Sequence, residues 1–102
     1  MPRFLLIALN GPTAGNEDAY NDWYDNEHAI DLMRVDGARS VRRFKVEAAN
    51  RTDRPYANVT EIEAESAEIV MQQLAERAST FPDSIDRDSS IFVLAREITQ
   101  GG

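Results

Sequence analysis

The sequence predicts an α+β fold in which two helices cover one face of a four-stranded antiparallel sheet. Four segments have the apolar or alternating composition of β-strands, and two segments carry apolar residues at helical spacing. They follow one another as strand, helix, strand, strand, helix, strand. The length of 102 residues suits one small domain, so we expect residues 1–102 to form a single unit.

The first strand is expected at residues 3–9, which form a continuous apolar run. Residues 10–15 have loop composition. The apolar start lacks a cleavage site of small residues and leads directly into patterned sequence, so we expect a strand rather than a signal peptide, and a cytoplasmic protein. No apolar run approaches the roughly 20 residues needed to span a bilayer, so no membrane partner is expected.

The first helix is expected to begin after Asn16, a candidate side-chain cap. Glu17 and Asp18 follow it and suit the positive end of a helix. The helix should end near Arg34, with Gly37 in the stop position. Its second half carries no clean apolar stripe, so an irregular course is expected there.

The second half of the chain supplies the remaining elements. They are expected as strands at residues 39–47, 56–63 and 91–98 and a helix at residues 66–79. Alternation within the third strand puts Asn58, Thr60 and Ile62 on one side together with Tyr56. Apolar residues at helical spacing are expected to cover the sheet at Ala67, Val70, Met71, Leu74, Ala75 and Ala78.

This order of elements is the split βαβ, or ferredoxin-like, arrangement. Both helices then pack on the same face of the sheet. A chain of this size has only a marginal core of its own. We therefore expect a homodimer in which a second copy covers the other face of the sheet.

Charge and composition narrow the possible partners. The net charge of −7 opposes binding to phosphate backbones, so no nucleic acid is expected. Four arginines cluster at Arg34, Arg39, Arg42 and Arg43. They form either a local anion site or ion pairs with nearby acids, and the ion-pair interpretation is favoured.

Cofactor chemistry has little support in the sequence. No cysteine is present, which excludes disulfides, zinc–thiolate sites and thiol nucleophiles. One histidine is a weak basis for a transition-metal site, and no phosphate loop or dinucleotide fingerprint occurs. We therefore expect no metal and no tightly held organic cofactor. Haem ligation by His28 stays open, because one histidine is enough for it.

Residues 20–28 are the most informative segment, since they hold the only tryptophan and the only histidine. Tyr20, Tyr24 and His28 are spaced by four and form one ridge of a regular helix. Trp23 and Glu27 lie on the neighbouring ridge. Core packing is the favoured interpretation for Tyr20 and Trp23.

His28 is the first candidate for proton chemistry near neutral pH. Asp25 and Asp31 each lie three residues from it along the chain. Either carboxylate is able to orient the imidazole and raise its basicity, which suits a general acid or base. The spacing does not choose between the two, and a histidine buried for structural reasons remains the alternative.

A set of short motifs resembles the dimeric α/β-barrel superfamily, and most closely its EthD-like branch, whose helix carries a Trp-Tyr…His signature. The motifs are Asn10-x-Pro12-x-x-Gly15, residues 20–28, Val35-Asp36-Gly37 and Arg43-Phe44. The resemblance implies a homodimer with a pocket between the sheet and the helices of each subunit. Relatives include polyketide cyclases, quinone-forming monooxygenases, haem-degrading enzymes and an isomerase, and proton transfer on small aromatic or carbonyl-bearing molecules is their common chemistry.

The functional hypothesis is a cofactor-independent lyase, dehydratase, cyclase or isomerase that binds a small molecule. His28 would be the acid or base, oriented by Asp25 or Asp31. The expected substrate-binding residues are Asn10, as an oxyanion donor, Trp23 and Tyr24, as pocket walls, and Arg43 and Tyr56, for a carboxylate or carbonyl. The alternatives are a haem- or quinol-type monooxygenase and a non-catalytic binding or auxiliary protein.

Overall fold

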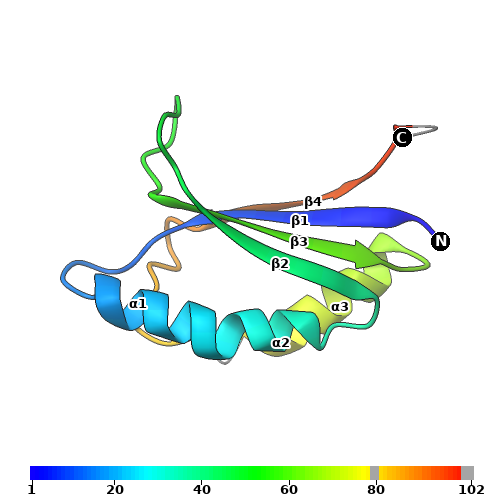
Figure 1. Cartoon of the computed structure of the whole chain (residues 1–102), viewed down its shortest axis with the longest axis horizontal. Helices are drawn as coiled ribbons and strands as arrows, with labels where there is room; N and C mark the ends of the chain where they lie inside the picture. The colour runs from blue at the N-terminus through cyan, green and yellow to red at the C-terminus, as the bar shows by residue number, and fades with distance from the viewer. Residues whose placement is uncertain (79–80, 100–102) are drawn as a thin grey trace.

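A computed structural model describes residues 1–78 and 81–99 and has the predicted order of elements (Figure 1). Four strands form one antiparallel sheet in the order β2-β3-β1-β4, and they are β1 (Arg3–Asn10), β2 (Ala38–Lys45), β3 (Tyr56–Glu63) and β4 (Ile91–Arg96). The helical elements are α1 (Glu17–Trp23), the π-helical η1 (Tyr24–His28), α2 (Ala29–Met33) and α3 (Ala67–Ala78). All of them lie on the same side of the sheet (Figure 1).

Strand register decides which side chains face the helices. In β3 the buried residues are Asn58, Thr60 and Ile62, which share one side of the strand as the alternation of the sequence predicts. In β1 the buried Phe4 and Leu6 lie on the same face. The predicted ends of two strands are wrong by two residues each: β2 stops at Lys45 rather than residue 47, and β4 at Arg96 rather than residue 98.

The core has two parts along the groove between sheet and helices. One part consists of Leu6, Tyr20, Trp23, Tyr24, Leu32 and Ile85, and the other of Phe4, Val35, Ile62, Ala64 and Val70. Tyr20 and Trp23 are therefore core residues, in agreement with the packing interpretation. In α3, Val70 is buried and Leu74 packs partly buried on both parts. The side chain of Ala78 and the predicted helix end at Ser79 lie outside the described residues.

The two helical stretches begin differently. The predicted side-chain cap at Asn16 is wrong, because its amide nitrogen donates to Thr13 Oγ1 at 2.7 Å instead. Only its backbone carbonyl serves the helix, accepting from Tyr20 N at 2.9 Å. At α3 the Ser66 hydroxyl does cap the helix and accepts from Ile69 N at 3.3 Å.

Gly37 occupies the predicted stop between α2 and β2. Its φ is +85°, in the left-handed region that glycine adopts without strain. The backbone of β3 passes directly beside it, and Glu63 N donates to Gly37 O at 2.9 Å. A Cβ atom at this position would lie 1.8 Å from the Glu63 carbonyl oxygen, so the position accepts only glycine.

The clustered arginines form ion pairs. Arg39 binds Glu63 at 2.9 Å, and Arg34 lies 3.5 Å from Asp31. Arg42 instead lies over the ring of Phe44. The ion-pair interpretation of the cluster is thus supported at Arg34, Arg39 and Arg43, the last of which pairs with Asp25 at 2.8 Å.

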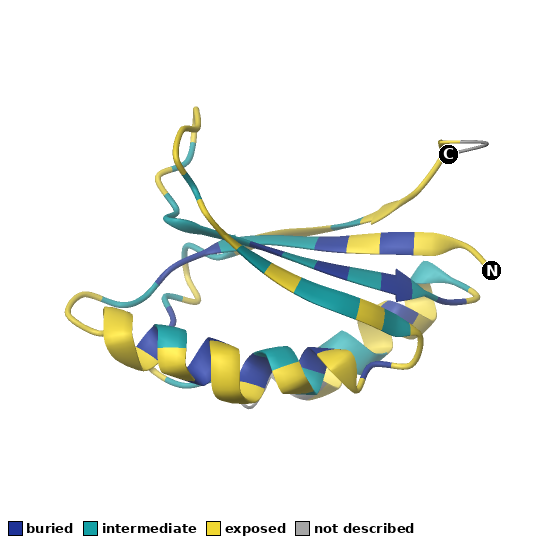
Figure 2. Ribbon diagram, in the orientation of Figure 1, coloured by how far each residue is buried: buried dark blue, intermediate teal, exposed yellow. Residues whose placement is uncertain are grey.

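No helix covers one face of the sheet (Figure 2), and strand register places apolar side chains on that face. Leu5, Phe44, Ile91 and Val93 are all exposed. In residues 1–78 and 81–99, no helix has the length and apolar character required to cross a membrane.

Candidate functional site

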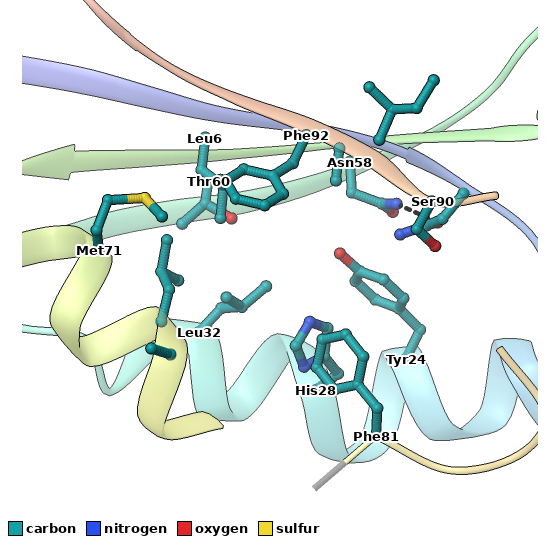
Figure 3. A pocket seen from close by; sticks show the side chains of 15 residues that line it. Leu6, Tyr24, His28, Leu32, Asn58, Thr60, Met71, Phe81, Ser90 and Phe92 are labelled. Atoms are coloured by element: carbon teal, nitrogen blue, oxygen red, sulfur yellow. Dashed lines mark hydrogen bonds between the residues drawn. The ribbon is translucent and has the colours of Figure 1, made fainter. Parts of the chain in front are cut away.

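A cavity of about 320 Å³ lies between the helix-facing side of the sheet and the helices (Figure 3). Most of its wall is apolar, with large contributions from Leu6, Leu32, Met71, Leu74, Phe81 and Phe92. Its polar groups come from Asn10, Tyr24, His28, Asn58, Thr60 and Ser90. The volume is at the lower end of the range of ~300–1,000 Å³ typical of small-molecule sites.

His28 forms part of the cavity wall and is only 8% exposed. Its imidazole lies parallel to the indole of Trp23, with 4.7 Å between the ring centroids. The rings of Tyr24 and Phe81 meet it edge-on, each with a centroid separation of 4.9 Å. The imidazole is thus held between aromatic rings beside the apolar cavity.

The π-helical segment explains why Trp23 reaches His28. Residues five apart are separated by about 140° around the axis of an α-helix and cannot stack. The wider turn of η1 brings the two rings into register. Regular helical spacing instead puts Trp23 next to Glu27, so helical periodicity does not predict the contact between Trp23 and His28. The expected irregularity lies in η1, whereas residues 29–33 are α-helical.

A chain of hydrogen bonds closes the polar end of the cavity. The Tyr20 hydroxyl donates to Asn10 Oδ1. The same oxygen accepts from Asn58 Nδ2 at 3.0 Å. Asn58 Oδ1 in turn accepts from Arg43 Nε at 3.2 Å. Asn10 and Asn58 both line the cavity, while Tyr20 and Arg43 support them from outside it.

Arg43 is fixed by contacts on several sides. Its guanidinium donates to Asp25 Oδ1 at 2.8 Å and to Asn21 Oδ1 at 2.9 Å. It also lies over the rings of Tyr24, 4.5 Å from the centroid, and Tyr56, at 5.3 Å. These bonds use most of the guanidinium donors within the protein itself.

The site therefore contains some of the expected residues and leaves others at its margin. Asn10, Tyr24 and His28 line the cavity, whereas Trp23 lies against His28 outside the lining. Tyr56 is also outside the lining; its hydroxyl donates to a carboxylate of α1 at 2.5 Å and accepts from an amide of α1 at 3.2 Å.

The two carboxylates expected near His28 have arginine partners. Asp25 pairs with Arg43, and Asp31 with Arg34. Their action on the imidazole stays a prediction. Among residues 1–78 and 81–99, no group of three or more metal-binding side chains converges.

Most of the lining residues were not among the expected site residues, and Asn58, Thr60, Phe81 and Ser90 are four of these. Alternation in the third strand put Asn58 and Thr60 on the same side as Ile62, and the structure shows that this side faces the helices. Phe81 and Ser90 belong to an irregular segment, where periodicity carries no information.

Burial raises the pKa of the Tyr24 hydroxyl, and it also raises the pKa of Tyr20, although the Arg43 guanidinium opposes the shift in both. Both groups are therefore neutral hydrogen-bond donors at physiological pH. The Tyr24 hydroxyl points into the cavity (Figure 3).

The raised tyrosine pKa values predict a loss of stability in alkaline solution. Above the ordinary tyrosine pKa of about 10, the unfolded chain releases phenolic protons that folded Tyr24 retains. Above about pH 10, the free energy of unfolding should then fall by up to about 1.4 kcal/mol per pH unit because of Tyr24. Below about pH 10, Tyr24 should not make the free energy of unfolding depend on pH. Urea unfolding between about pH 8 and about pH 11 measures the slope. Tyr24→Phe should flatten it, and an unchanged slope in that variant would contradict the assignment.

No protein-family model matches this chain, and no curated protein matches it by sequence. Solved structures match it over nearly its whole length. An ethyl tert-butyl ether D (EthD) family protein of Bacillus halodurans aligns with a TM-score of 0.59 and 14% identity, over 96% of this chain and 100% of its own. The Arabidopsis thaliana protein At3g17210 aligns with a TM-score of 0.61 and 17% identity, over 97% of each chain.

A third match is a Dabb family protein with a ferredoxin-like fold from Mesorhizobium loti, with a TM-score of 0.56 and 9% identity over 99% of this chain and 100% of its own. This chain has the ferredoxin-like fold. The predicted α+β architecture and the structural likeness to EthD-like proteins are both confirmed. At these sequence identities the likeness establishes the fold, whereas the activity depends on the residues of the site.

Proposed function

We propose that this chain is a cytoplasmic, homodimeric enzyme that transfers a proton on a small apolar molecule bearing a carbonyl group, without a cofactor. His28 is the general acid or base. The reaction class is that of a lyase, dehydratase, cyclase or isomerase. The observation that carries the proposal is the only histidine of the chain in the wall of an apolar cavity.

The surroundings of His28 support this role. Imidazole takes up and releases protons near neutral pH, unlike the other side chains of the cavity. The stacked Trp23 and the edge-on Phe81 hold the ring and keep water from it. An apolar wall with a few polar groups at one end suits a small molecule with one oxygen-bearing group.

Deuterium exchange tests the proposal without knowledge of the natural substrate. The purified protein is incubated in D2O with small aromatic methyl ketones and 1,3-diketones, and loss of the proton signals next to the carbonyl is followed by NMR. We expect exchange faster than in the same buffer with an equal concentration of free imidazole. No acceleration for any of these compounds would overturn proton transfer, and tight binding without exchange would favour the non-catalytic binding protein.

The proposed homodimer rests on the apolar face of the sheet that no helix covers (Figure 2). Strand register places Ile7 of β1 directly between Val59 of β3 and Val93 of β4. These three form a row across the sheet, beside the exposed Leu5 and Ile91. A patch of this kind is unusual on a monomer, and a second copy of the same face is its simplest cover.

We expect light scattering to give the mass of a dimer at micromolar concentration, and Val93→Glu to give a folded monomer. Val93 is 52% exposed in the single chain, so its replacement should disturb the pairing of two chains more than the core of one. Ile69→Glu is the matched control, because Ile69 is 43% exposed on α3, on the other side of the molecule. A wild-type monomer, or a dimer that survives Val93→Glu unchanged, would contradict this interface.

A further inference from the structure

We infer that the polar end of the cavity binds a hydrogen-bond-accepting oxygen of the occupant, through the amide N–H groups of Asn10 and Asn58 and the Tyr24 hydroxyl. We further infer that Arg43 is a positioning residue that fixes this donor set without touching the occupant. The chemical step assigned to the oxygen rests on the proposed function, whereas the binding preference does not.

The orientation of the Asn58 amide follows from Arg43. The Nε–H of an arginine only donates, so the Asn58 atom 3.2 Å from it is the oxygen. The amide nitrogen must then lie on the opposite side, toward Asn10. Because Asp25 and Asn21 hold the guanidinium, Asn58 has little freedom to flip.

The orientation of Asn10 follows in turn. Since Asn58 donates through its nitrogen, the Asn10 atom that receives this bond is also an oxygen. The Tyr20 hydroxyl donates to the same oxygen, and both of its lone pairs are then used. The Asn10 amide nitrogen is left with its two N–H donors, and no other described residue accepts a hydrogen bond from it.

Tyr24 adds a third donor at the same end. Burial raises the pKa of its hydroxyl, so the group keeps its proton. Figure 3 shows this hydroxyl reaching into the cavity, with the Asn58 side chain above it in the view. The Arg43 guanidinium lies 4.5 Å from the centroid of the Tyr24 ring, and its positive charge favours negative charge close to this hydroxyl.

An end of this kind binds a carbonyl oxygen and disfavours an ammonium or another donor-only group. It also stabilises the charge that proton transfer creates. When His28 removes a proton from the carbon next to the carbonyl, the C–H bond breaks and an N–H bond forms on the imidazole. The electron pair moves to the oxygen as an enolate, which the three donors bind more strongly than the ketone. Return of the proton restores His28, and the step needs no oxidant or reductant.

Two probes of nearly the same shape test the preference. 2-Acetylnaphthalene carries the oxygen and 2-ethylnaphthalene lacks it. We expect calorimetry to show the ketone binding about tenfold tighter, the scale of two or three net hydrogen bonds. The infrared carbonyl stretch of the bound ketone should move to lower wavenumber than in water. Equal affinities, an unshifted stretch or no binding of either probe at millimolar concentration would overturn the inference.

Arg43→Met tests the positioning role, with Arg42→Met as the matched control. Arg42 is the preceding residue of the same strand and contacts Phe44 on the opposite face of the sheet. Arg43→Met should narrow the affinity ratio to about threefold or less and reduce the carbonyl shift, because Asn58 is then free to flip. Arg42→Met should change neither the affinity ratio of the two probes nor the shift of the carbonyl stretch. If Arg43→Met does not fold, Tyr20→Phe loosens Asn10 in the same way, and a wild-type ratio and shift in that variant would overturn the positioning argument.

His28→Ala separates this inference from the proposed function. That variant should lose deuterium exchange and keep the preference for the ketone. Preference without exchange in the wild type would refute proton transfer and leave the oxygen site intact. Exchange that depends on His28, together with equal binding of the two probes, would refute the oxygen site and leave proton transfer intact.

Discussion

Replacement of His28 with alanine is expected to lower the rate of proton transfer by about 100-fold or more, the usual scale for losing a general acid or base. The cavity holds no second histidine, and Tyr24, with its raised pKa, is a poor base at neutral pH. The fold should survive, at a cost of about 1–2 kcal/mol for the lost contacts with Trp23 and Phe81.

Deuterium exchange on a methyl ketone measures the rate, and circular dichroism checks the fold. The matched control is Glu27→Gln, since Glu27 is the preceding residue of η1 and is exposed. Free imidazole should restore part of the exchange in His28→Ala, because the space of the missing ring is open to the cavity. A folded variant with full exchange would place the chemistry elsewhere, and an unfolded one would make His28 a structural residue.

The contact between His28 and Trp23 offers an independent readout. A protonated imidazole quenches the emission of an indole stacked against it, and this chain has one histidine and one tryptophan. Wild-type fluorescence should therefore change with pH in the neutral range, where an imidazole gains or loses its proton. This change should be absent in His28→Ala and kept in Glu27→Gln.

Replacement of Gly37 with alanine is expected to cost at least about 3 kcal/mol of unfolding free energy, from left-handed strain, a steric clash and a lost hydrogen bond. The new Cβ would lie 1.8 Å from the Glu63 carbonyl oxygen, so β2 must move away from β3. The bond from Glu63 N to Gly37 O is then lost. For a domain with a marginal core, such a loss is enough to unfold a large fraction of the chains.

Gly15→Ala is the control that isolates the clash. Gly15 has a similar φ of +80°, but nothing lies within 4 Å of the position of a Cβ atom. Gly15→Ala should lower the free energy of unfolding by only about 1 kcal/mol, which is the cost of the left-handed conformation alone. Urea unfolding measures both variants. Similar losses at the two glycines would show that close approach of β3 does not govern position 37.

The element order was predictable because it depends on local patterns. An apolar run, an alternating segment and a helical stripe are each read within one element. Where the structure describes the ends of these elements, the predictions matched to within about two residues. Gly37 was predictable as a stop for the same reason. Asn16 was not, because Thr13 competes for its side chain in the turn before the helix.

The sequence by itself determined that His28 and its aromatic neighbours share a helical stretch, and that Asn58 and Thr60 lie on one side of their strand. Only the tertiary structure decided what these residues contact. The π-helical turn stacks Trp23 on His28, and the spacing of apolar residues in the sequence does not predict such a turn. The register of β1 on β3 pairs Ala8 with Asn58 and so sets Asn10 diagonally beside it, and a slip of one residue would send Asn58 to the other face. Arg43, from β2, completes the site because pairing of strands distant in sequence brings it there.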